Sequence, residues 1–349
     1  MLGAAPAALV LDRFAPGRHT AIFVTAALAI IPLAGYIGDA TDDLARRFGG
    51  AVGGLLNATF GNAAELIIGI IALRRGLTGL VKASLTGSII GNVLLVFGMC
   101  AFVGGIRYPV QRFNRTAAGM ATTMLLLSAI GLTVPAVFHL LARRGGSTAE
   151  LRLDTEIAVV LLLTYCASLV FTLKTHRDLS GLTETSERPP RGSAWRPVAM
   201  LAAATAGVAW MSELLVGAVD DAARALGMSD LFTGVVILAI VGNAAEHYSA
   251  IVMAARNRMD AAIAIAVGSS TQIALFVAPV LVFVSYAIAP APMNLLFSVF
   301  EVVAVGLAVL TISVIAHDGE THWMEGVQLL AVYIILALGF YFLPSPPAS

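Results

Sequence analysis

The sequence predicts an all-α polytopic membrane protein built from two inverted-topology repeats of five transmembrane helices. Three observations lead to this fold class. Hydrophobic residues make up 58% of the 349 residues and charged residues only 12%, and the mean hydropathy is +0.89. Apolar runs extend along the whole chain, and one five-residue motif occurs once in each half. A soluble globular domain carries about twice this share of charged residues, so the composition excludes that class.

A helix that crosses a bilayer needs about 20 predominantly apolar residues. Ten stretches meet this requirement, separated by turn residues and charges: 20–38, 51–73, 80–104, 116–141, 154–173, 197–217, 231–255, 261–287, 292–316 and 323–343. The longest polar stretch divides them into two sets of five. We therefore expect a short N-terminal stub at 1–19, a first five-helix repeat at 20–173, a linker at 174–196 and a second repeat at 197–349.

The two halves repeat in sequence. Residues 61–65 and 242–246 both read Gly-Asn-Ala-Ala-Glu, and they are 181 positions apart. Gly87-Ser88 and Gly268-Ser269 are also 181 positions apart. Upstream, Asp42-Asp43 and Asp220-Asp221 are 178 positions apart. Equivalent helices lie five spans apart, and because five is odd the second copy crosses the membrane in the opposite direction. Inverted repeats are typical of secondary transporters, whose substrate sites form near the midplane between the halves.

The charge pattern limits the possible partners and locations. The net charge is zero, so no basic field suggests nucleic acid. Cys100 and Cys166 stand far apart in apolar segments, without the spacing of a metal or thiol-redox motif.

A small excess of basic residues on the linker side predicts a cytoplasmic linker under the positive-inside rule. Short loops and termini lead us to expect a bacterial plasma (inner) membrane protein.

Two glutamates inside apolar segments predict a cation site. An ionised carboxylate at the centre of a bilayer costs at least about 2.5–3.5 kcal/mol, so Glu65 and Glu246 are expected to have a function. Asn62 and Asn243 precede them by three residues and, on a helix, share their faces. The following helices offer more oxygen atoms, on Ser88, Asn92, Ser269 and Gln272. Oxygen ligands without Cys or Met favour a hard cation, and two carboxylates favour a divalent one such as Ca²⁺.

The same carboxylates can hold protons in place of the cation. Removal from water favours the neutral, protonated carboxyl group, whereas a bound cation favours the ionised form. Cation and protons then exclude one another. If only the loaded or the protonated site reorients across the membrane, downhill proton flow drives uphill cation flow.

Other polar residues in the spans give weaker signals. Four aspartates lie at helix ends: Asp42, Asp43, Asp220 and Asp221. Capping or solvated roles are the default there, although their repetition also suits cation access. Glu213 and Glu301 lack acidic counterparts in the other half, so a structural role and a gating or proton-relay role are both open. His247 points about 100° away from Glu246 on a helix, which makes it a less favoured ligand.

Several motifs together resemble the Ca²⁺/H⁺ antiporter family, the cation/proton exchangers of the wider cation/Ca²⁺ exchanger superfamily. They are the segments 61–69, 87–92, 173–176, 242–247, 268–272 and 318–320, with Trp323 and Glu325-Gly326. The resemblance implies that Glu65 and Glu246 bind Ca²⁺ or protons alternately. It also implies that the site is lined by Asn62, Asn243, Ser88, Ser269 and Gln272.

The chain departs from this family in three places. Family members usually have eleven spans, and the first is represented here only by residues 1–14. The linker lacks the acidic run of some eukaryotic members, so we expect no regulatory Ca²⁺ binding there. Asp42 and Asp43 stand where the family has glutamates, a difference that bears on cation access and not on the central site.

The expected function is therefore secondary active transport, an exchange of Ca²⁺ for H⁺, with no cofactor and no enzymatic activity. The bilayer and the two transported ions are the expected partners. An antiporter of Na⁺, K⁺ or Mn²⁺ is the alternative within the same class, because these ions also accept oxygen ligands. A passive cation channel is the alternative from another class, but channels usually form acidic rings from symmetric subunits. A metalloenzyme is a weaker alternative, because the sequence contains no His-Glu-x-x-His motif.

Overall fold

The structure, a computed structural model, describes residues 3–48, 50–141, 147–175 and 193–343. Most of the predicted linker, 176–192, lies outside these residues. The first half contains α1 (Ala4–Phe14), α2 (His19–Phe48), α3 (Gly50–Phe60), α4 (Ala63–Arg74), α5 (Thr78–Ile90), η1 (Gly91–Val96), α6 (Phe97–Arg107), β1 (Gln111–Arg112), α7 (Arg115–Leu141), α8 (Ser147–Val170) and η2 (Phe171–Thr175). The second half contains α9 (Trp195–Ala225), α10 (Asp230–Phe232), η4 (Thr233–Leu238), α11 (Ala239–Gly242), α12 (Ala244–Ala255), α13 (Met259–Gln272), η5 (Ile273–Val277), α14 (Ala278–Ile288), α15 (Val299–Ile315), β2 (Glu320–Thr321) and α16 (Trp323–Phe342).

The predicted class of all-α polytopic membrane protein is confirmed. Among the described residues, seven helices are long and apolar enough to cross a membrane, and one bent pair, Asp230–Gly242 with Ala244–Ala255, makes an eighth candidate span. The other two predicted spans correspond to the pair α3 and α4 and to α15, which has 17 residues. The short antiparallel pairing of β1 with β2 was not predicted, and it joins the α6–α7 connection to the α15–α16 connection.

Two predicted spans are interrupted where the sequence predicts continuous helices. The span predicted at 51–73 breaks between Phe60 and Ala63, and the one predicted at 231–255 breaks at Asn243 with a bend of 62°. Asn62 and Asn243 are consequently the residues that precede α4 and α12, not residues within a continuous helix. Because the residues on both sides of each break are apolar, the hydropathy pattern does not reveal the break.

The ninth predicted span starts later than expected. The sequence predicts residues 292–316, whereas α15 begins at Val299. Pro290 and Pro292 lack backbone N–H groups, which disfavours a helix through this segment. Ser298 then caps the helix, and its side chain and that of Glu301 form a reciprocal capping box.

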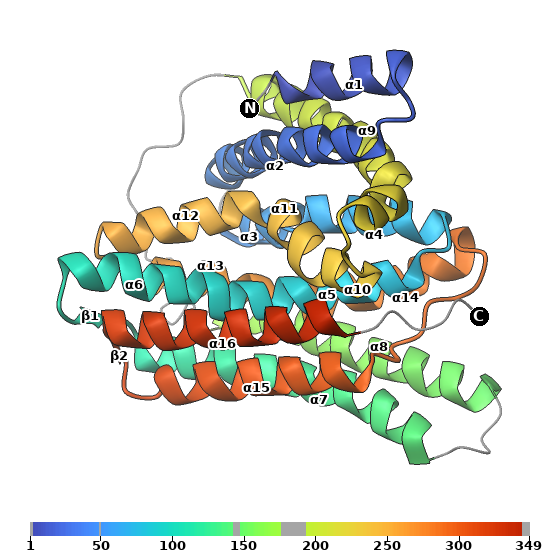
Figure 1. The fold of residues 1–349 in the computed structure, drawn as a ribbon. Helices are drawn as coiled ribbons and strands as arrows, with labels where there is room; N and C mark the ends of the chain where they lie inside the picture. The colour runs from blue at the N-terminus through green and yellow to red at the C-terminus, as the bar shows by residue number, and fades with distance from the viewer. Residues whose placement is uncertain (1–2, 49, 142–146, 176–192, 344–349) are drawn as a thin grey trace.

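The helices form layers in which equivalent elements run in opposite directions (Figure 1). α1, α2 and α9 form a layer on one side, and α7, α8 and α15 lie on the other side. Between them, the continuous rod of α5 and α6 runs opposite to that of α13 and α14. His19, at the start of α2, lies 3.4 Å from Asp221, near the end of α9, so these two helices are also antiparallel.

The helix bounds repeat with the offset seen in the sequence. α4 and α12 occupy 63–74 and 244–255, and α6 and α14 occupy 97–107 and 278–288, in each case 181 positions apart. η1 and η5 occupy matching places within their rods. Each π-helical turn accommodates one residue more than an α-helical turn, a feature often found at functional sites.

Lys82 on α5 secures the irregular segment between α14 and α15. Its Nζ atom donates hydrogen bonds to Asn294 Oδ1 at 3.0 Å and to the carbonyl oxygen of Leu296 at 2.7 Å. The negative charges of Glu301 and Asp154 also attract this ammonium group. Non-helical backbone within a membrane protein needs such partners, because lipid supplies none.

Replacing Lys82 with Met is expected to destabilise the fold by about 1–3 kcal/mol, the range for leaving buried polar groups unsatisfied. The acceptors on Asn294 and Leu296 would lose their donor, and two acids would lose a nearby cation. Thermal unfolding of the purified protein in detergent measures the effect. Lys174→Met, at an exposed position, is the matched control and should leave the melting temperature unchanged. Equal melting temperatures for both variants would contradict this role of Lys82.

Candidate cation and proton site

The two broken helices bring the repeated motifs to the centre of the molecule. Glu65 and Glu246 lie in the first turns of α4 and α12. The amino-terminal end of a helix carries a partial positive charge, which favours an ionised carboxylate close by. A carbon added at Gly242 would lie 3.5 Å from Glu65 Oε1, so Glu65 packs against the repeated motif of the other half. The negative charges of the Glu65 and Glu246 carboxylates repel each other.

Side-chain amides and hydroxyls link the two halves around these glutamates. Asn62 Nδ2 donates to Gln272 Oε1 at 2.6 Å, and Asn243 Nδ2 donates to Ser88 Oγ at 2.9 Å. Ser269 Oγ lies 3.2 Å from Glu246 Oε2 and 3.4 Å from Asn62 Oδ1. A serine hydroxyl has one hydrogen, so Ser269 donates to only one of these oxygens at a time. All seven residues expected at the site are therefore brought together, five of them through these bonds between the halves.

Glu65 is the least satisfied of the central residues. The residue is 7% exposed, and neither carboxylate oxygen has a hydrogen-bond partner among the described residues. Buried polar atoms are nearly always paired, so an unpaired buried carboxyl group indicates a place for a proton or a cation. Asn62, Ser88 and Asn243 are buried as well.

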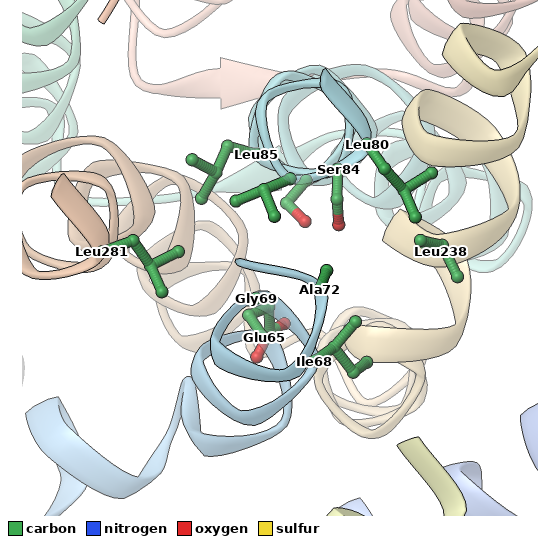
Figure 2. Close-up of a pocket in the computed structure, with 11 residues that line it drawn as sticks. Glu65, Ile68, Gly69, Ala72, Leu80, Ser84, Leu85, Leu238 and Leu281 are labelled. Carbon is green, nitrogen blue, oxygen red and sulfur yellow. The ribbon is translucent and has the colours of Figure 1, made fainter. Parts of the chain in front are cut away.

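A narrow cavity runs from Glu65 along α4 and α5 (Figure 2). The volume that the centre of a water molecule can occupy in this cavity is about 10 Å³, close to the minimum needed to hold one water molecule. Its lining is mostly apolar, with Glu65, Ser84 and Ser88 as the polar members and Ile68, Ala72 and Leu80 among the others. The cavity thus leads from the central carboxylate toward the turn between α4 and α5.

Asn92 and His247 join the network more closely than the sequence indicated. Asn92 Nδ2 donates to Asn243 Oδ1 at 3.0 Å and to Ser269 Oγ at 3.2 Å, and His247 Nε2 lies 3.1 Å from Asn92 Oδ1. The position equivalent to Asn92 in the second half is Ile273. A search for repeated polar residues therefore gives Asn92 little weight, although its place four residues after Ser88 on a helix was a usable signal.

The six outer acids lie outside this hydrogen-bond network, and several have partners of their own. Asp43 pairs with Arg47, and Asp221 pairs with His19 and Arg224. Glu213 pairs with Arg75 at 2.7 Å. Glu301 accepts hydrogen bonds from Thr86 and from the backbone of Ser298. Asp42 and Asp220 lie near the ends of α2 and α9. Access and gating roles for these acids stay predictions.

Comparison with known proteins identifies relatives along nearly the whole chain. Residues 18–174 and 196–342 match the sodium/calcium exchanger protein family. The Ca²⁺/H⁺ antiporter of Synechocystis sp. is 45% identical over 344 residues, which cover 94% of this chain and 92% of that protein. The Ca²⁺/H⁺ antiporter ChaA of Bacillus subtilis is 46% identical over 92% of each chain. This chain belongs to the Ca²⁺/H⁺ antiporter family within the sodium/calcium exchanger superfamily.

Solved structures and a eukaryotic relative extend the family comparison. The structure of native YfkE matches with a TM-score of 0.84 at 43% identity, covering 98% of each chain. The H⁺/Ca²⁺ exchanger CAX matches with a TM-score of 0.71 at 15% identity, a likeness in fold alone. The vacuolar calcium ion transporter of Schizosaccharomyces pombe is 44% identical over 330 residues.

The site of this family member suits a hard cation bound by oxygen. Among the described residues no group of three or more His, Cys, Asp and Glu side chains could hold a metal ion. Besides the two carboxyl groups, the site offers amide and hydroxyl oxygens, on Asn62, Asn243, Gln272, Ser88 and Ser269. Such ligands suit Ca²⁺, which tolerates irregular coordination, better than they suit zinc or copper.

Proposed function

We propose that this protein exchanges Ca²⁺ for protons across a membrane, with Glu65 and Glu246 binding the cation and the protons in turn. The observation that carries the proposal is the buried carboxyl group of Glu65, which has no hydrogen-bond partner among the described residues and lies against the second copy of its own motif. Asn62, Asn243, Ser88, Ser269 and Gln272 supply further oxygens. The names and high identity of the relatives support the choice of ions.

The architecture of the exchange follows from the repeat. We propose two five-helix halves, 20–173 and 197–349, that meet at the site, and the matching helix bounds support this division. Ca²⁺ bound between the two carboxylates excludes protons, and protonation excludes Ca²⁺. Reorientation of only the loaded and the protonated forms then couples the two fluxes. The bacterial relatives support a plasma-membrane location, although relatives from fungi and plants are named as vacuolar.

Proton-driven ⁴⁵Ca²⁺ uptake into proteoliposomes tests the proposed function. With an acidic interior, outward proton flow is expected to drive Ca²⁺ inward, and a protonophore should abolish the uptake. Raising the external pH at a fixed gradient should lower the KM for Ca²⁺, because protons compete for the same carboxylates. Excess Na⁺, K⁺ or Mn²⁺ tests selectivity. Absence of uptake, or uptake that persists without a proton gradient, would contradict Ca²⁺/H⁺ antiport.

A further inference from the structure

An ion pair joins the end of α4 to the face of α9. Arg75 Nη2 donates to Glu213 Oε1 at 2.7 Å and to the backbone oxygen of Glu213 at 3.2 Å. Gly217, one turn further along α9, makes room for the guanidinium group, because a carbon added there would lie 2.8 Å from Arg75 Nη1. α4 carries Glu65 in its first turn. The ion pair therefore connects the helix of the central carboxylate to α9.

The pair spans the boundary between two parts of the fold. α2 and α9 lie with α1 in one layer, and α4 belongs to the neighbouring layer of broken helices (Figure 1). A hydrophobic cluster separate from the main core lies along this boundary, and small residues such as Ala34, Ala63, Ala64 and Ala204 contribute to it. In transporters of this architecture, access alternates when one bundle moves against the other. Contacts across such a boundary must change during the cycle.

We propose that Arg75 and Glu213 form a latch that holds α9 against α4 in one access state and opens in the other. The proposal rests on the proposed antiport, because it concerns the movement that this transport requires. An interaction made in only one of two states shifts the equilibrium toward that state by its own free energy. Both side chains are partly exposed, at 37% and 49%, so the ion pair is expected to change the equilibrium constant between the two access states only about two- to fivefold.

The inverted repeat shows that the latch exists on one side only. The position equivalent to Arg75 is Arg256, at the offset of 181, but the position equivalent to Glu213 is Gly35, at the offset of 178. Asp39 stands where the other half has Gly217, and no ion pair between Asp39 and Arg256 is found among the described residues. The arginine is thus repeated while its acidic partner is not. The two access states consequently differ in energy through this contact.

Chemical cross-linking tests whether the contact must open. In a variant that lacks Cys100 and Cys166, Arg75→Cys with Glu213→Cys would be joined by a short reducible bismaleimide, with the yield followed by mass spectrometry. Cross-linking is expected to stop Ca²⁺ uptake, and reduction should restore it. The control is Leu33→Cys with Gly207→Cys, a pair in contact between α2 and α9 within their shared layer, and it should transport when cross-linked. Full uptake by the protein cross-linked between 75 and 213 would overturn the latch.

Charge variants test which state the contact favours. The ratio of the KM values for Ca²⁺ on the two sides would be measured in right-side-out and inside-out vesicles. Glu213→Gln and Arg75→Gln should each change this ratio two- to fivefold in the same direction, and the exchange Arg75→Glu with Glu213→Arg should restore it. Gly35→Glu with Asp39→Gly places the missing acid opposite Arg256 and should shift the ratio in the same direction as the single-charge variants, because the new contact stabilises the other access state.

The outcomes separate the latch from the proposed function. An unchanged ratio in both single-charge variants would overturn the latch while leaving antiport intact. Failure of the unmodified protein to take up Ca²⁺ would instead contradict the proposed function.

Discussion

Glu65→Gln and Glu246→Gln are each expected to reduce proton-driven Ca²⁺ uptake on the order of 100-fold or more. Under the proposed function, each substitution removes one of the two carboxylates that bind the cation, and loss of one partner from a buried charged contact typically costs about 2–5 kcal/mol. Glutamine also cannot carry the exchanged proton. Its near-identical volume preserves packing, so the purified variants should keep the fold.

The measurement is initial ⁴⁵Ca²⁺ uptake per molecule of reconstituted protein, with melting temperature as the check on folding. Glu156→Gln on the exposed face of α8 is the matched control, since it makes the same chemical change away from the site. Its uptake should equal that of the unmodified protein. A folded Glu65→Gln or Glu246→Gln variant that transports at the unmodified rate would show that the site has been assigned wrongly.

Gly87→Ala is expected to produce the largest loss of stability of any conservative substitution in the central helices. A carbon added at Gly87 would overlap the carbonyl oxygen of Val235, and only backbone movement relieves such an overlap. α5 here crosses η4 of the other half at very short range. Overpacking typically costs about 1–3 kcal/mol and occasionally more, so we expect a reduced melting temperature and a low yield of monodisperse protein.

The repeat provides the control for this substitution. Gly268 occupies the equivalent position in the second half, and a carbon added there meets nothing within 4 Å. Gly268→Ala should therefore be neutral or slightly stabilising, because alanine favours a helix by up to about 1 kcal/mol over glycine. Similar melting temperatures for the two variants would mean that α5 and η4 do not approach as closely as the structure shows.

Much of the fold could be predicted from the sequence because lipid imposes simple rules. Long apolar stretches and a repeated offset were enough to place most spans and to predict opposite directions for equivalent helices. The central residues were also predictable, since Glu65 and Glu246 are costly in an apolar segment and recur in one register. In each case a strong physical penalty leaves a clear signal in the sequence.

Local backbone geometry was harder to predict because its signals are weak. The breaks before α4 and α12 occur at Asn-Ala-Ala sequences, which are also compatible with a continuous helix. The role of Lys82 depends on a segment more than two hundred positions away. Asn92 has no polar equivalent in the second half. Contacts made by only one half are invisible to an argument from repetition.

Lys82 has a practical consequence for reconstitution experiments. Its equivalent in the second half is Ile263, so the polar anchoring of α5 has no matching contact on α13. The molecule is therefore not symmetric about the membrane midplane, and molecules inserted into vesicles in opposite orientations are not equivalent. Uptake curves from a randomly oriented preparation should be sums of two unequal saturation curves, and a single fitted constant would describe neither population.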